Sequence, residues 1–84
     1  MYEVLLERSV ERALKRVSQP DFTRILVALK ELASNPRPPG CKKLVGGERD
    51  WRVRVGDYRV LYEIDDAEKA VRVLNVKHRR EAYR

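Results

Sequence analysis

The sequence predicts a small α+β domain of two layers, in which an N-terminal strand and a helical hairpin pack on an antiparallel sheet of about four strands. Two apolar stretches in the first half repeat with the helical period, and three stretches in the second half alternate with the strand period. Neither half is long enough to bury its own apolar face. We therefore expect a single domain over residues 1–84.

The chain is expected to begin with a strand followed by a helix. Residues 2–6 are a short run of strand-forming residues. Ser9 is a candidate N-cap for the first helix, because apolar residues recur at helical spacing from Val10 to Val17.

A second helix is expected to follow after a connection short enough to make an antiparallel hairpin. Ser18 and Asp21 are spaced like a weak capping box, and Pro20 suits a first helical turn. The helical spacing of apolar residues then continues until Asn35-Pro36, which predicts the end of the helix.

The second half of the chain is predicted to form a meander of strands. Residues 35–50 contain the proline and glycine residues of a loop. Strands are expected at 51–55, 58–64 and 71–76, with a tight turn at Gly56-Asp57. Short turns between consecutive strands favour antiparallel pairing, and the helical hairpin then covers one face.

Composition limits the function classes. The 84 residues carry 19 Lys and Arg against 13 Asp and Glu, a net charge of +6, which suggests a polyanionic partner. The length excludes a large enzyme with a deep cofactor pocket. One cysteine, Cys41, and one histidine exclude an intrachain disulfide and make a zinc site implausible, so no cofactor or metal is expected. The apolar run Val4–Leu6 is too short for a signal peptide or membrane span, which favours a cytoplasmic protein without membrane contact.

Arginines on the predicted strands are the first candidate site. Arg52 and Arg54 alternate with the apolar residues of their strand, so both point to the face that the helices leave open. Arg59 of the next strand joins them if the register allows. Three guanidinium groups on one face form a phosphate site, whereas the alternative is an ordinary solvated face.

The basic tail is the second candidate site. It contains His78, Arg79, Arg80 and Tyr83 directly after the last strand. Tyr83 is suited to stacking on a base, and His78 titrates near neutral pH. The alternatives are a frayed basic terminus and a structural histidine.

Two motifs together resemble a known family. They are GDYRVLYEI at residues 56–64 and HRREAYR at residues 78–84, accompanied by Trp51–Val55 and by Lys43-Leu44 with Gly46 or Gly47. With the predicted element order, the chain resembles the RelE-type toxins of the RelE/ParE toxin–antitoxin superfamily over essentially its whole length.

This resemblance implies a four-stranded antiparallel sheet with a helical hairpin on one face. It also implies an mRNA endonuclease that enters the ribosomal A site and cuts the codon there, and a RelB-like antitoxin that blocks it. Operator DNA is then a partner through the antitoxin complex. By position, the resemblance assigns active-site roles to residues of the strands and the tail: Arg52, Arg54, Arg59, Arg79 and Tyr83.

The sequence departs from the best-known RelE toxins in one respect, since those carry lysines where this chain has Arg52 and Arg54. Arginine stays protonated and is a poor general base. Our hypothesis is that His78 or Tyr83 takes part in proton transfer, or that cleavage is slow. Four further cations either contact ribosomal RNA or are solvated surface: Lys42, Lys43, Lys77 and Arg80.

Three alternatives remain at this point. A ParE-type toxin shares the fold and inhibits DNA gyrase without cutting RNA. A catalytically weak homologue binds its antitoxin and operator DNA alone. A generic RNA-binding module binds RNA without shortening it.

Overall fold

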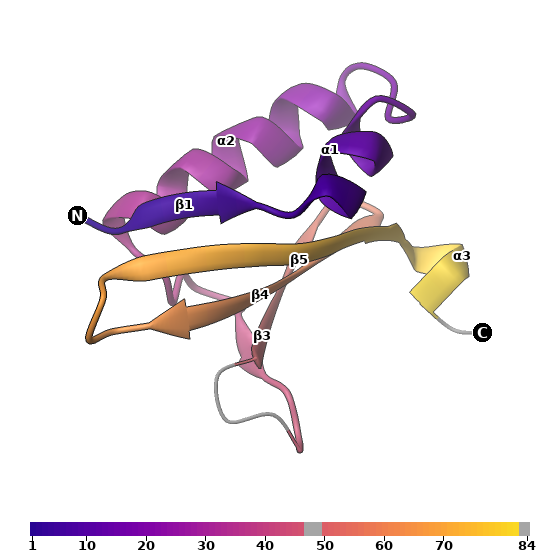
Figure 1. The fold of residues 1–84 in the computed structure, drawn as a ribbon. Helices are drawn as coiled ribbons and strands as arrows, with labels where there is room; N and C mark the ends of the chain where they lie inside the picture. Colours follow the sequence, from indigo (N-terminus) through magenta and orange to yellow (C-terminus); the bar gives the residue numbers. More distant parts are fainter. Residues whose placement is uncertain (47–49, 83–84) are drawn as a thin grey trace.

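Two helices cover one face of a five-stranded sheet in the structure, a computed structural model that describes residues 1–46 and 50–82 (Figure 1). The predicted two-layer α+β fold is confirmed. The elements in chain order are β1 (Glu3–Leu6), α1 (Arg8–Leu14), α2 (Asp21–Ser34), β2 (Lys42–Lys43), β3 (Asp50–Val55), β4 (Tyr58–Asp65), β5 (Ala70–His78) and α3 (Arg79–Ala82). The strand order in the sheet is β1-β5-β4-β3-β2.

The edges of the sheet differ from the prediction. β1 pairs with β5 in parallel, while the other neighbouring strands are antiparallel. β2 lies inside the segment predicted as loop, so the sheet has five strands where about four were expected. Both residues of β2 are exposed lysines, and an exposed two-residue strand carries no apolar alternation that a sequence pattern can detect.

The helices start without the predicted side-chain caps. The N-cap position of α1 is Glu7, and the Ser9 hydroxyl instead donates a 3.2 Å hydrogen bond to the Leu74 carbonyl of β5. α2 follows Pro20 and also lacks a side-chain cap, so the predicted capping box is wrong. α2 has 14 residues, and no helix within 1–46 and 50–82 is long and apolar enough to cross a membrane.

The core lies between the helices and the sheet. In β4, alternate residues from Val60 to Ile64 are buried, and those between them point to the opposite face, here called the open face. The buried apolar residues are Val10, Leu14, Ile25, Leu29, Leu32, Val53, Val60, Tyr62, Ile64, Val71, Val73 and Val76.

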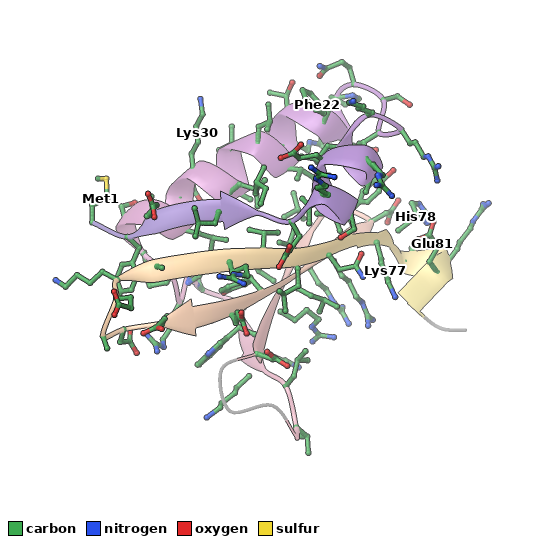
Figure 2. All side chains as sticks on the ribbon, in the orientation of Figure 1. Met1, Phe22, Lys30, Lys77, His78 and Glu81 are labelled. Carbon is green, nitrogen blue, oxygen red and sulfur yellow. The ribbon has the colours of Figure 1, made fainter. Side chains whose placement is uncertain are left out.

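A bulge in β5 decides which residues of its end face the core. The register against β4 shifts after Val73, which leaves Leu74 as an extra residue. Val73 and Val76 are therefore both buried although they are three positions apart. As a consequence, Lys77 lies on the open face, and His78 lies on the side of the sheet that the helices cover (Figure 2).

Candidate functional site

Three cations lie side by side across the open face at one end of the sheet. The register pairs Arg54 of β3 with Arg59 of β4, and Arg59 with Lys77 of β5. We call Arg54, Arg59 and Lys77 the cationic row. Like charges directly opposite each other destabilise a sheet, so this arrangement is one that an anionic ligand would stabilise.

Arg52 continues the basic surface one step further along β3. It pairs with Lys42 of β2 on one side and with Leu61 of β4 on the other, so these side chains share the open face. Its Nε atom is buried and has no hydrogen-bond partner in the described part of the chain. A buried donor without an acceptor is rare in folded proteins, and the oxygen of a ligand or of water would satisfy it.

A pocket of about 230 Å³ lies at the β3–β4 turn, next to the cationic row. Gly56 turns the chain there with a φ of +59°, which favours glycine. Arg79, at the start of α3, reaches the same pocket. The residues that line it are Arg54, Gly56, Asp57, Tyr58, Arg59 and Arg79.

The β3–β4 turn also holds α3 in place. The Arg79 backbone N–H donates a 2.7 Å hydrogen bond to the Asp57 carbonyl, and Arg79 Nη1 lies 3.8 Å from Asp57 Oδ1. Both side chains are about two-thirds exposed, at 66% and 64%. The structure thus brings Arg79 of the predicted tail site together with Arg54 and Arg59 of the predicted strand site.

His78 is not brought into the cationic row. Its ring makes an edge-on contact with Tyr58 at 5.1 Å between centroids. Its Nδ1 accepts a 3.2 Å hydrogen bond from the Arg80 backbone N–H. A neutral His78 with Nδ1 as acceptor carries its proton on Nε2. It can therefore accept a proton at Nδ1 after the Arg80 bond breaks.

The remaining predicted site residues divide between the two faces and the tail. Lys42 shares the open face with Arg52, whereas Lys43 pairs with Trp51 and points the other way. Arg80 is exposed on α3. Tyr83 lies outside the described residues.

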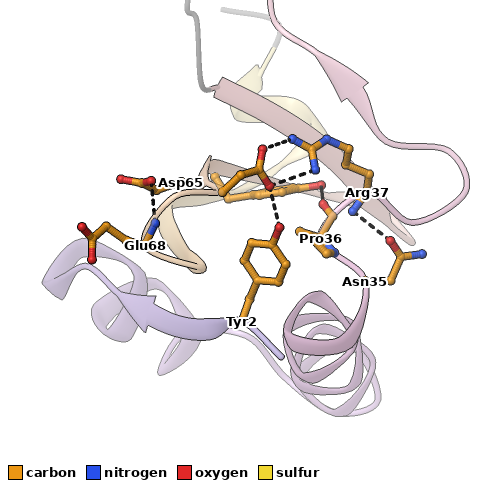
Figure 3. Close-up of polar contacts among 8 residues, drawn as sticks. Tyr2, Asn35, Pro36, Arg37, Asp65 and Glu68 are labelled. Carbon is orange, nitrogen blue, oxygen red and sulfur yellow. Dashed lines mark hydrogen bonds and ion pairs between the residues drawn. The ribbon is translucent and has the colours of Figure 1, made fainter.

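A second polar cluster, which the sequence did not predict, surrounds a single arginine at the opposite end of β4 (Figure 3). Arg37 donates from Nη2 and Nη1 to the two Asp66 carboxylate oxygens at 2.8 and 3.3 Å, and its guanidinium lies 5.1 Å from the Trp51 ring centroid. The Tyr2 hydroxyl donates to the same carboxylate. We call Arg37, Asp66, Tyr2 and Trp51 the Arg37 cluster.

The contacts within the Arg37 cluster shift the pKa values of Asp66 and Tyr2. The hydrogen bond from Arg37 and then the one from Tyr2 hold the pKa of Asp66 below its usual value. The bond to Asp66 raises the pKa of Tyr2. Nearby, burial raises the pKa of Tyr62, whose hydroxyl donates a 2.8 Å hydrogen bond to the Pro36 carbonyl. No sequence motif marks this cluster, because Tyr2 and Asp66 are 64 positions apart.

Metal ligands do not gather in the described part of the chain. Within 1–46 and 50–82 there is no group of three or more His, Cys, Asp and Glu residues that could hold a metal ion. Cys41 is a free, half-buried thiol.

Comparison with protein families gives one match over nearly the whole chain. The profile of the family described as "ParE toxin of type II toxin-antitoxin system, parDE" matches residues 4–83. A search of the curated proteins gave no match.

Solved structures with the same fold include RelE toxins. A chain of the archaeal RelE–RelB complex from Pyrococcus horikoshii is 30% identical, with 93% of this chain and 94% of that chain covered and a TM-score of 0.84. A chain of the RelBE2 toxin–antitoxin complex from Mycobacterium tuberculosis is 31% identical, with 92% and 96% covered and a TM-score of 0.64. The isolated Escherichia coli RelE toxin is 19% identical, with 99% and 96% covered and a TM-score of 0.80, a likeness of fold alone.

Proposed function

The chain belongs to the ParE toxin family within the RelE/ParE superfamily of type II toxins, and on this premise we propose that it is a ribosome-dependent mRNA endonuclease. The proposed reaction is cleavage of the A-site codon by attack of a ribose 2′-OH on the adjacent phosphate. One observation carries the proposal: Arg54 and Arg59 of the cationic row line one pocket together with Arg79. The 30% identity to the Pyrococcus horikoshii chain supports it.

The cations suit the charge that develops on the phosphate. Attack by the 2′-OH forms a bond to phosphorus, breaks the bond to the 5′-oxygen, and leaves a cyclic phosphate and a 5′-hydroxyl. Arg54 and Arg59 can donate paired hydrogen bonds to the phosphate oxygens. Arg52 adds positive charge further along β3 on the same face. Arg79 is assigned to the leaving 5′-oxygen, and Tyr83 to base stacking or orientation of the 2′-OH.

Proton removal from the 2′-OH is the step least served by arginine. We assign it to Tyr83 or His78. For His78, the hydrogen bond from the Arg80 backbone N–H to Nδ1 would have to break first. His78→Ala separates the two. Unchanged cleavage by that variant would leave the step to Tyr83, and a loss of cleavage with unchanged melting temperature would assign it to His78.

We propose two further partners, ribosomal RNA and a RelB-like antitoxin. Lys42, Lys43, Lys77 and Arg80 are proposed to contact ribosomal RNA, which makes docking weaker at high salt. RelE chains in the related structures are in complex with RelB antitoxins. For this chain we propose a RelB-like antitoxin that places acidic residues on the basic surface and links the complex to operator DNA. The site of action is then the cytoplasm, where ribosomes are.

The match to the ParE profile favours a second candidate, inhibition of DNA gyrase. Such a toxin would act by binding and would leave RNA intact. A supercoiling assay with purified gyrase tests this candidate directly. Inhibition of supercoiling without RNA cleavage would replace the endonuclease proposal.

Primer extension on an mRNA positioned in the A site of purified ribosomes tests the main proposal. We expect cuts within the A-site codon that require the ribosome and disappear in an Arg79→Ala/Tyr83→Ala variant. Naked mRNA is the substrate control. Glu68→Gln, in the exposed turn between β4 and β5, is the matched surface variant and should cut as the native protein does. No cut by well-folded native protein would overturn the proposal.

A further inference from the structure

Asp57 occupies an unusual position for a carboxylate, in a pocket lined by three arginines. It is the one acidic residue among the six that line the pocket, where three are arginines. It follows Gly56 in the β3–β4 turn and contacts Arg79 at the start of α3 through both its carbonyl and its carboxylate. A carboxylate here repels a bound phosphate. Its presence is therefore explained most simply by a role before the phosphate binds.

The turn itself does not require the charge of Asp57. Gly56 supplies the left-handed backbone conformation, with a φ of +59°. Asparagine serves in tight turns as well as aspartate does. The 2.7 Å bond from the Arg79 N–H goes to the Asp57 backbone carbonyl, which an asparagine keeps. The carboxylate is thus left with one described contact, the Arg79 guanidinium at 3.8 Å.

That contact is weak enough to exchange. Both partners are about two-thirds exposed, and exposed ion pairs with this geometry are screened by water. A phosphodiester offers two oxygens in the forked geometry that a guanidinium prefers. Exchange of Asp57 for phosphate therefore needs little energy and moves Arg79 a short way within the same pocket.

We propose that Asp57 is a positioning residue that holds Arg79 over the pocket until a phosphodiester of the RNA substrate takes its place. The inference rests on the proposed endonuclease function, because it describes how the free enzyme prepares its site. Asp57 acts through Arg79 and makes no contact with the reacting atoms. It also reduces repulsion among Arg54, Arg59 and Arg79 before substrate binds.

Asp57→Asn tests the proposal in the ribosome assay. We expect kcat to fall by about five-fold, the size of effect an exposed pair can exert, while KM does not rise. In an Arg79→Ala background the same substitution should change kcat by less than about two-fold, because residues that act through one another are not additive. Asp57→Glu should restore most of the rate, and Glu68→Gln, which removes the same charge from the β4–β5 turn, should have no effect.

Equal losses from Asp57→Asn in the native and Arg79→Ala backgrounds, or a fall in melting temperature that parallels the loss, would overturn the positioning role. A readout without catalysis separates this from failure of the endonuclease proposal. The ¹⁵N-NMR signal of Arg79 Nε–H should shift in Asp57→Asn and stay in place in Glu68→Gln. It should also respond to a 2′-O-methyl dinucleotide, a phosphodiester that cannot be cleaved. An unchanged Arg79 signal in Asp57→Asn would reject the inference whether or not the protein cuts RNA.

Discussion

The two ends of β4 use arginine in opposite ways. In the Arg37 cluster, one guanidinium is held by both oxygens of Asp66 and lies over the Trp51 ring. In the cationic row, Arg54 lies beside Arg59 and Arg59 lies beside Lys77, and in the adjoining pocket Asp57 contacts Arg79 at 3.8 Å. The residue type is the same, and the surroundings differ.

The difference separates Arg37, whose contacts tie the fold together, from a row of cations that we propose binds phosphate. The contacts of Arg37 connect three segments that are distant in sequence: the segment before β1, the segment after α2 and the β4–β5 turn. Removal of Arg37 should therefore lower the free energy of unfolding. The cationic row gathers like charges, so removal of one member should be felt in function and hardly in stability. Four predictions follow this contrast from its largest effect to its smallest.

Arg54→Ala is expected to lower the rate of A-site cleavage by about 10²-fold, because it removes one donor aimed at the charge that develops in the reaction. Its free energy of unfolding should stay within about 0.5 kcal/mol of the native value, since Arg54 is exposed and lies opposite a like charge. Single-turnover cleavage and urea denaturation measure the two quantities. If the free energy of unfolding fell by as much as the activation free energy of cleavage rose, the contrast between the two ends of β4 would be wrong.

Tyr62→Phe is expected to destabilise the fold by about 1–2 kcal/mol and to leave cleavage unchanged. Tyr62 is fully buried, and its hydroxyl satisfies the Pro36 carbonyl at 2.8 Å. Phenylalanine fills the same space and leaves that acceptor without its donor. Urea denaturation gives the change. An unchanged free energy of unfolding would mean that water replaces the hydroxyl as the donor to the Pro36 carbonyl.

Arg37→Ala is the mirror of Arg54→Ala at the other end of β4. We expect a loss of about 1 kcal/mol in the free energy of unfolding, a value reduced for solvent screening because the Arg37 side chain is 41% exposed. The cleavage rate should match that of the native protein. A variant that is as stable as the native protein but cleaves slowly would place Arg37 with the cationic row and break the comparison.

The fold could be predicted because its main elements carry strong periods. The alternation in β3 and β4 and the helical spacing in α2 follow directly from burial of one face. The caps could not be predicted in the same way. Ser9 resembles a cap in sequence, but its hydroxyl donates to the Leu74 carbonyl of β5, a contact made across 65 positions.

The candidate site could be predicted in part, and the β5 bulge explains the part that was missed. Alternation from Val71 and Val73 without a bulge would turn Lys77 to the core and His78 to the open face. The register shift at Leu74 reverses both. Arg52, Arg54 and their strand are unaffected by it, so their shared face was predictable. A bulge depends on packing between strands, and no local pattern of residues predicts it.

The smallest expected effect is the pH dependence that the Arg37 cluster gives to the stability of the fold. The folded pKa of Asp66 is lowered, so its contribution to stability is full above its usual pKa of about 3.9 and is lost as pH falls through the lower folded value. The folded pKa of Tyr2 is raised, so its contribution is full below about 10 and is lost as pH rises through the higher folded value. Asp66→Asn should weaken both edges of the stability–pH profile, and Arg37→Ala should weaken mainly the acid edge and spare the alkaline one. Urea denaturation between pH 2 and pH 11 measures the profile, with Glu68→Gln as the control for loss of a surface carboxylate. An Asp66→Asn profile that keeps both edges would show that the cluster does not couple proton binding to folding.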